Sequence, residues 1–248
     1  MSRTAAYSAL VLRSRPSGES NSEVFLLTAE EGLIKATVFG GPKSKLRAFA
    51  SPYNSGQVWI YRDKAKDYAK LSDFDVRSWR PGLREMYERS MAAAAISDTI
   101  LSSHGGGGEW AAAIKLAAET LDTLENASEE LSGRLLVYFL WRWAGFLGIQ
   151  PFIDCCSVCD RGDETLLWFN AHEGAVLCAN CLGTESALSS GFLKLNPGCR
   201  KWLSVAGEQE PSCLYRYSMD NKSFYEAKTL TTAILTGVIG KKLSSWEY

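Results

Sequence analysis

Four cysteines in two C-x-x-C pairs are the residues whose types and spacing predict chemistry most directly. Cys156, Cys159, Cys178 and Cys181 follow the pattern C-x2-C-x18-C-x2-C. Zinc prefers four tetrahedral ligands, and this spacing falls in the range typical of zinc sites. Each pair can form a tight turn, and the insert between the pairs is long enough for a small hairpin. We therefore predict a zinc ribbon, the alternative being four buried thiols in a ribbon that has lost its metal.

The residues around the cysteines favour a structural metal over a catalytic one. A catalytic zinc keeps one position open for water, whereas four cysteines close the shell. The nucleobase-deaminase pattern, H-x-E followed by P-C-x-x-C, fails here because His172 and Glu173 are adjacent and no proline precedes the second pair. His172 is expected at a hairpin tip. The sequence also has only two histidines and lacks the phosphate-loop, nucleophile-elbow and H-E-x-x-H motifs, so no enzyme is predicted.

Length and composition predict a globular, intracellular protein. The 248 residues, 46% of them hydrophobic, suit two or three compact units. Seven cysteines, four of them in paired form, suit thiols kept reduced in the cytosol better than a disulfide framework. No run of apolar residues is long enough to span a membrane, and the first residues do not resemble a secretory signal. We expect a cytoplasmic location and no membrane contact.

The distribution of charge is uneven along the chain. The net charge is −1, but residues 1–80 carry 13 basic against 8 acidic side chains, and the remainder carries 14 against 20. A basic N-terminal region on an otherwise acidic chain points to a phosphate-bearing partner. Chance clustering of the charges is the alternative.

The pattern of apolar residues predicts a barrel followed by helices. Residues 5–80 contain five predicted short strands, the third of which alternates apolar and polar residues, joined by hairpins and one longer loop, as in a small closed barrel. Strong helix formers follow, and residues 130–148 are apolar almost all round, so they are placed at the centre of a helical bundle. Predicted helices span 84–103, 110–124, 130–148, 184–206 with a break at 196–198, and 226–243.

The barrel region contains nine candidate DNA-binding cations. Barrels of this kind bind single strands through a basic groove lined with aromatic stacking platforms, for which Phe39, Tyr53, Trp59 and Tyr61 are candidates. In the alternative reading the aromatics face the core and the cations are only solvated. The candidate cations are Arg13, Arg15, Lys35, Lys43, Lys45, Arg47, Arg62, Lys64 and Lys66.

Three stretches carry a resemblance to a known family. They are LVLRSRPSGESNSEVFLLTAEEGLIKATVFGGPKSKL, LGIQPFIDCCSVCD and FNAHEGAVLCANC, in this order along the chain. Together they resemble the bacterial RecO recombination-repair family over roughly residues 4–80 and 134–183. Three separate motifs in the expected order make the resemblance specific.

The resemblance implies an α+β multidomain architecture. Its parts would be an OB-fold DNA-binding barrel at 1–80, a helical domain at 81–152, a four-cysteine zinc module at 153–183, and a C-terminal helical part at 184–248 that packs on the helical domain. By position, Lys35, Lys43, Lys45 and Arg47 would be DNA-contacting residues. The four cysteines of the two pairs would bind a structural zinc.

The resemblance also implies a function without catalysis. Proteins of this family are recombination mediators that bind single- and double-stranded DNA and anneal complementary strands. With RecR-like and RecF-like proteins they load recombinase onto DNA coated by single-stranded-DNA-binding protein. A chain of this kind would act in the cytoplasm, associated with the nucleoid.

The chain departs from the family pattern in its charge. The loop that reads like KGARRPKS in such proteins is the shorter FGGPKS here. Because counterion release scales with the number of phosphates neutralised, fewer cations give weaker binding. The hypothesis is that this chain alone binds DNA weakly and needs a RecR-like partner to complete the basic surface. The alternatives are an adaptor that binds only proteins, and a zinc hydrolase or deaminase that uses Glu173.

Overall fold

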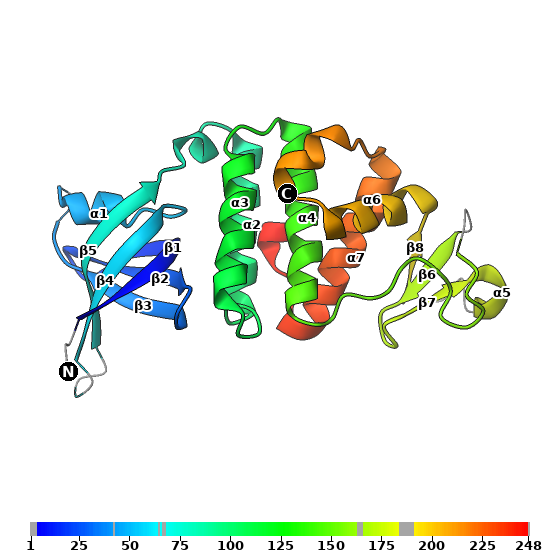
Figure 1. The fold of residues 1–248 in the computed structure, drawn as a ribbon, viewed down its shortest axis with the longest axis horizontal. Coiled ribbons are helices and arrows are strands. Elements are labelled where there is room, and N and C mark those ends of the chain that lie inside the picture. Colours follow the sequence, from blue (N-terminus) through cyan, green and yellow to red (C-terminus); the bar gives the residue numbers. More distant parts are fainter. Residues whose placement is uncertain are drawn as a thin grey trace. The chain divides into compact units, whose positions relative to one another are not determined.

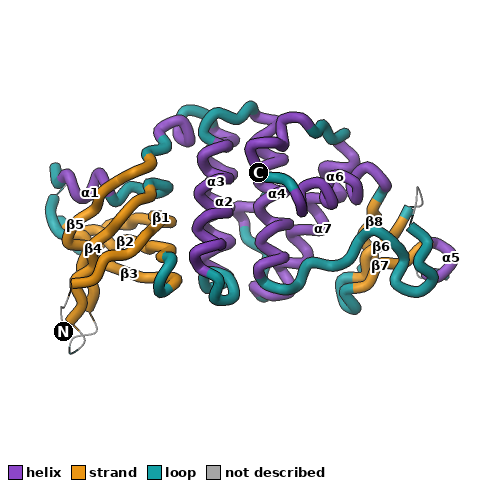
Figure 2. The backbone as a smooth tube through the Cα atoms, viewed as in Figure 1, coloured by secondary structure: helices purple, strands orange, loops and turns teal. Residues whose placement is uncertain are grey.

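The chain forms two compact units, an N-terminal unit of residues 1–127 and a C-terminal unit of residues 128–248 (Figure 1). The computed structural model describes residues 4–41, 43–63, 65, 68–162, 166–183 and 191–247. The fold class is α+β, as predicted: strands form a barrel and a small sheet, and helices make up most of the rest (Figure 2). The finer domain boundaries at residues 80, 152 and 183 stay predictions.

The N-terminal unit begins with a five-stranded closed barrel, which confirms the barrel prediction. The strands close in the order β1-β2-β3-β5-β4, with β4 antiparallel to β1. Only β3 and β5 run parallel, and they share a single registered pair, Thr37 with Lys70. The seam between these two strands is therefore the most open part of the barrel wall. The strands are β1 (Thr4–Ser17), β2 (Asn21–Thr28), β3 (Gly32–Val38), β4 (Ser55–Asp63) and β5 (Tyr68–Ser78).

The barrel core follows from the alternation of apolar residues along each strand. Successive side chains of a strand point to opposite faces, so every second residue is buried. In β3, Ile34, Ala36 and Val38 are buried, while Lys35 between them is exposed. A short helix that the sequence did not predict, α1 (Lys45–Phe49), packs Leu46 and Phe49 against the same core.

The barrel packs against the two helices of the same unit: α3 (Trp110–Leu124) contacts β2 and β1, and α2 (Tyr87–Ser102) contacts β1. Gly32, with a φ of +71°, lies so close to the Trp110 ring that a Cβ would stand 2.7 Å from it. Gly105, in the loop between the helices, lies against Leu27 and Leu33 in the same way. The outer face of the β2–β3 hairpin is thus covered at its turn end.

Arg80 lies where the chain leaves the barrel, ahead of a 3-10 turn, η1 (Pro81–Arg84). Its side chain is only 1% exposed. The Nε donates to Asp122 Oδ1 of α3 at 2.7 Å, and Nη1 donates to the carbonyl oxygen of Tyr53 in the barrel. Because a buried charge is stable only when it is paired and hydrogen-bonded, these partners fix the barrel to α3.

The C-terminal unit is built around α4 (Glu129–Phe146), which packs against α6 (Pro197–Glu208) and α7 (Asn221–Ile239). Residues on every side of α4 are buried, including Leu135, Phe139 and Trp143, which confirms its predicted central place. Side chains of Ser128, Asn196 and Asp220 cap the first turns of α4, α6 and α7 by accepting backbone N–H groups. Two 3-10 turns complete the unit, η3 (Pro211–Arg216) and η4 (Ser244–Trp246).

The predicted cysteine-bearing hairpin is present in the C-terminal unit and carries a third strand. Strands β6 (Leu167–Asn170) and β7 (Ala175–Cys178) pair, α5 (Ala179–Leu182) follows, and β8 (Phe192–Leu195) adds to the other edge of β6. The prediction of a helix across 184–206 was wrong at residues 192–195, because there the backbone pairs with β6 as a strand. Helix α6 starts at Pro197, within the predicted break, and residues 184–190 lie outside the described part. None of the helices described has the length and apolarity that crossing a bilayer requires.

We expect Arg80→Ala to lower the free energy of unfolding by about 3 kcal/mol, because Asp122 and the Tyr53 carbonyl lose a buried cationic donor. Denaturant unfolding of the full chain, followed by circular dichroism, measures the change. Arg77→Ala is the matched control. Arg77 is 65% exposed, and its partners Asp75 and Gln57 are reached only at the surface, so its loss should cost less than about 0.5 kcal/mol. Equal losses for the two variants would contradict the anchoring role of Arg80.

Candidate metal centre and nucleic-acid interface

The four cysteines of the two C-x-x-C pairs converge on one point. The Sγ atoms of Cys156, Cys159, Cys178 and Cys181 all lie within 4.8 Å of one another, and those of Cys159 and Cys178 are 3.6 Å apart. Sulfurs about 2.3 Å from a tetrahedral metal ion stand about 3.8 Å from each other. The cluster therefore has the dimensions and the donor set to hold one thiophilic metal ion.

The protonation of the cluster is divided among its members. Burial raises the pKa of Cys156, but hydrogen bonds from the backbone amides of Val158, Cys178 and Cys159 outweigh burial and lower it to about 6. The Cys181 pKa is raised to about 12, chiefly by hydrogen bonds with Cys159 and Cys178. Four thiolates this close repel one another without a cation between them. A bound divalent ion would compensate that repulsion and displace the remaining protons.

Backbone geometry aims the first cysteine pair at the second. The Cys156 carbonyl accepts from the Asp160 amide at 3.0 Å, and Asp160 adopts a φ of +55°, so the chain turns back directly after Cys159. The Ser157 amide donates to the carbonyl of Val176 in β7, and the Val176 amide donates to Ser157 Oγ. This reciprocal pair joins the first turn to the strand that ends at Cys178.

Arg200 of α6 holds both flanks of the first cysteine pair. Its buried guanidinium donates to the carbonyl oxygens of Asp154 at 2.8 Å and Gly162 at 3.0 Å, and more weakly to that of Ile153. These acceptors come just before Cys155 and just after Arg161. The sequence analysis missed Arg200, because nothing in its local pattern distinguishes it from a solvated helix arginine.

The residues that suggested catalysis lie at the hairpin tip, as predicted. Asn170 Oδ1 accepts the backbone amides of His172 and Glu173, and Gly174 closes the turn with a φ of +65°. Both side chains are exposed, and neither belongs to the group of sulfurs that can hold a metal. Cys155, which is also outside the group, has a pKa raised first by burial and then by the nearby Asp160 and Asp154.

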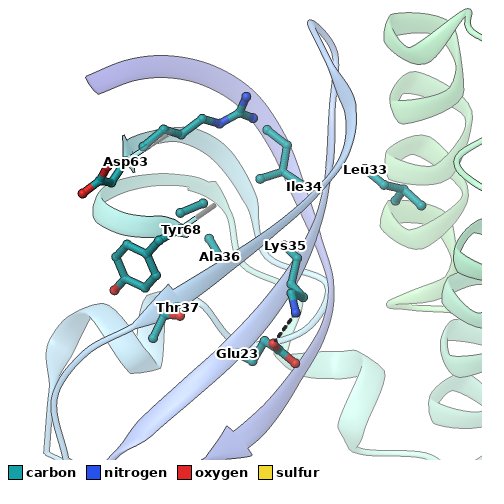
Figure 3. A pocket seen from close by; sticks show the side chains of 10 residues that line it. Glu23, Leu33, Ile34, Lys35, Ala36, Thr37, Asp63 and Tyr68 are labelled. Atoms are coloured by element: carbon teal, nitrogen blue, oxygen red, sulfur yellow. Dashed lines mark ion pairs between the residues drawn. The ribbon is translucent and has the colours of Figure 1, made fainter. Parts of the chain in front are cut away.

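Four of the predicted DNA-binding cations pair with acidic side chains of the same unit. Arg13 pairs with Asp98 of α2, and Arg62 pairs with Glu31 at 2.6 Å. The Glu23 carboxylate forms ion pairs with both Arg15 and Lys35, and its distance to Lys35 Nζ is 3.0 Å (Figure 3). Hydrogen bonds from Lys35 and then from Arg15 hold the pKa of the Glu23 carboxyl below its usual value. These pairs reduce the positive potential that a polyanion would meet on this part of the barrel.

The basic segment at residues 43–47 is different; we call it the basic loop, although the structure places Lys45 and Arg47 in the short helix α1 rather than in the expected loop. Lys43 and Lys45 are exposed and Arg47 is half-buried, and none of the three forms an ion pair with any residue described by the structure. Beside the loop, Arg47 and Arg15 line a hollow of about 350 Å³, and Ser14, Ser22 and Ser51 are also among its lining residues. Lys64 and Lys66 lie outside the described residues.

A larger hollow, of about 490 Å³, opens along the seam between β3 and β5 (Figure 3). Lys35, Thr37 and Tyr68 line it, and the Glu23–Lys35 ion pair lies at its edge. Of the predicted aromatic platforms, Phe39 and Tyr61 line an adjoining hollow, and Trp59 precedes Tyr61 by two positions on β4. Tyr53 lies apart, in the loop before β4, where its carbonyl accepts from Arg80.

Comparison with known proteins identifies the same relatives for both units. The family model described as "Recombination protein O N terminal" matches residues 1–79, and "Recombination protein O C terminal" matches residues 84–247. The chain is 27% identical to "DNA repair protein RecO" of Syntrophomonas wolfei, over 87% of this chain and 83% of that protein. The protein of the same name from Syntrophus aciditrophicus is 24% identical, over 95% and 91% of the two chains.

Cys159→Ala should abolish stoichiometric metal binding, because three thiolates leave the ion with an incomplete shell. We expect elemental analysis after dialysis against a chelator to find about one metal ion per chain in the parent protein and almost none in the variant. Melting of the C-terminal unit should move to lower temperature. Cys155→Ala removes the neighbouring thiol and should retain the ion. Retention by Cys159→Ala, or loss from Cys155→Ala, would contradict the ligand set.

Arg200→Met should weaken metal affinity about tenfold, because the carbonyls on both flanks of the first cysteine pair lose their common donor. Competition with a chromophoric chelator measures the affinity. The control is Lys201→Met, which removes an exposed cation from the next position of α6. If both variants bind metal as the parent does, Arg200 does not position the ligands.

Proposed function

This chain belongs to the recombination protein O family, and from that premise we propose that it is a non-enzymatic recombination mediator in DNA repair. It binds single- and double-stranded DNA through its barrel and anneals complementary strands. The observation that carries the proposal is the basic loop, whose Lys43, Lys45 and Arg47 have no acidic partner among the described residues while the other described candidate cations do.

Phosphate binding by the basic loop follows from simple electrostatics. A cation that is already paired with a carboxylate neutralises little of a phosphate's charge and so releases few counterions from the nucleic acid. An unpaired cation neutralises the phosphate fully and contributes its whole share to the affinity. The hollow lined by Arg15 and Arg47 also contains serines in its lining, and guanidinium and hydroxyl groups are donors suited to a phosphodiester. Annealing needs no covalent step, because neutralising two backbones lowers their mutual repulsion.

The four-cysteine cluster supports this function as a scaffold. We propose that it binds zinc, for which four thiolates in tetrahedral reach are the usual structural shell. The shell leaves no position for a substrate or a water molecule. The zinc holds the β6–β7 hairpin and its flanking turns together, and no chemistry is assigned to it.

The small number of unpaired cations favours a shared DNA surface. We propose that the chain binds DNA weakly by itself and completes its basic surface with a RecR-like protein. Together with a RecF-like protein, it then loads recombinase onto DNA coated by single-stranded-DNA-binding protein. Such a role places the chain in the cytoplasm, at the nucleoid. The competing reading, an adaptor that contacts only proteins, predicts no DNA binding even at low salt.

The double variant Lys43→Glu/Lys45→Glu should lose at least about tenfold in affinity for a labelled single-stranded oligonucleotide at low salt. Its log–log salt slope should flatten by about 1.4, since each single-strand phosphate contact contributes about 0.7. Fluorescence anisotropy across a salt series measures both quantities, with and without the RecR-like protein of the same organism.

Lys201→Glu/Lys241→Glu is the charge-matched control, with two exposed lysines of the C-terminal unit. It should keep the parent affinity and slope. Equal losses in the two double variants would show that only net charge matters and would refute the basic loop as the contact. Absence of binding by the parent chain, alone and with the RecR-like protein, would move the function to the adaptor reading.

A further inference from the structure

One part of the barrel surface combines an exposed phenyl ring and two partly buried tyrosines with a cation. Its hollow, of about 380 Å³, is lined by Phe39, Tyr61, Tyr68, Lys70 and Ser72. We call it the aromatic hollow. The sequence singled out Phe39 and Tyr61 but not Tyr68 or Lys70, which come from a different strand.

Strand pairing brings these residues together. Lys70 of β5 is registered with Tyr61 of β4 on one side and with Thr37 of β3 on the other. Tyr68 and Lys70 share the outer face of β5, because Leu71 between Lys70 and Ser72 points into the core. Phe39 follows β3 directly, so it reaches the same patch across the β3–β5 seam.

The geometry of the patch suits a flat, electron-rich partner. Phe39 is 44% exposed, although an exposed phenyl ring forgoes its hydrophobic stabilisation. Its ring lies 6.2 Å from that of Tyr68, tilted by 58°, and Lys70 Nζ stands 5.3 Å from its centre. The Tyr68 hydroxyl is buried and has no hydrogen-bond partner among the described residues. A phenyl ring that is 44% exposed, a cation over that ring and a buried hydroxyl without a partner among the described residues therefore adjoin a single hollow.

The aromatic hollow is one of the open aromatic surfaces among the described residues of the barrel. Barrels of this fold commonly bind oligonucleotides on the face of strands 2 and 3. Here Trp110 and the Gly105 loop cover that face at its turn end, beside Leu27 and Leu33. At the other end, Arg15 lies over the Phe25 ring while it pairs with Glu23. Stacking at the β3–β5–β4 side avoids both obstructions.

We propose that the aromatic hollow binds an unpaired nucleobase, which stacks on Phe39 while Lys70 takes the adjoining phosphate. Stacking on an aromatic side chain is tolerant of sequence, because every base has a π-face. Bases inside a duplex are stacked on one another and do not reach the ring. The hollow therefore makes this chain select single strands over duplex, which the basic loop alone does not do. The proposal rests on the DNA-binding function proposed above and adds the base-contacting site.

The test compares two probes of equal charge on the full chain. One is a labelled oligothymidylate of about 20 nucleotides, and the other is an abasic strand of the same length. Phe39→Ala should weaken binding of the oligothymidylate about tenfold and leave binding of the abasic strand and the salt slope unchanged. Phe39→Trp should restore the loss. Tyr87→Ala, which removes a 67% exposed ring from α2, is the matched control and should change neither affinity.

Each other result overturns the proposal. Equal weakening on both probes would show that Phe39 acts through the fold or the charge of the barrel, and unchanged binding would show that no base stacks there. Lys43→Glu/Lys45→Glu must weaken both probes alike, so it separates the two sites. If the parent chain binds neither probe, with or without the RecR-like protein, the DNA-binding function itself fails. If it binds both probes equally, only the stacking site fails.

Discussion

The buried guanidinium of Arg80 is the constraint on which the N-terminal unit depends. A charge that is 1% exposed cannot be solvated, so it must keep Asp122 of α3 and the Tyr53 carbonyl within hydrogen-bond reach at the same time. That requirement fixes the position of the start of β4 relative to α3. With α3 held in this position, the Trp110 ring packs against the β2–β3 turn and covers that part of the barrel. Among the described residues, the side of β3, β5 and β4 and the basic loop lie away from that covered turn.

Ion pairing divides the barrel cations into two groups with different uses. Glu23 forms ion pairs with two cations, and Glu31 and Asp98 each form an ion pair with one. Those carboxylates stabilise the barrel surface but reduce what it offers to a phosphate backbone. The low net charge of the chain is therefore only part of the reason for the weak DNA binding that we propose. The arrangement of the acidic residues matters as well, and it leaves the basic loop as the strongest unpaired feature of the described barrel surface.

The sequence predicted the features that are local and missed those that depend on pairing between distant strands. Five strands, the buried helix α4 and the cysteine hairpin are encoded in periodicity and spacing, which act over a few residues. The pairing of Glu23 with Lys35 depends on the β2–β3 register, and the meeting of Tyr61 with Lys70 depends on β4–β5. Strand β8 was predicted as helix because Phe192-Leu193-Lys194-Leu195 is too short for its alternation to be decisive, and only β6 specifies its conformation. Arg200 is a similar case, since its three acceptors lie about 40 residues earlier in the chain.

The strand order of the small sheet has a consequence for synthesis on the ribosome. The sheet runs β7-β6-β8, so its last strand in sequence pairs with its first. All four cysteines therefore emerge from the exit tunnel before β8 and before Arg200. A nascent hairpin can take up its ion while one edge of β6 is still unpaired, and the later residues then close over a module that is already formed.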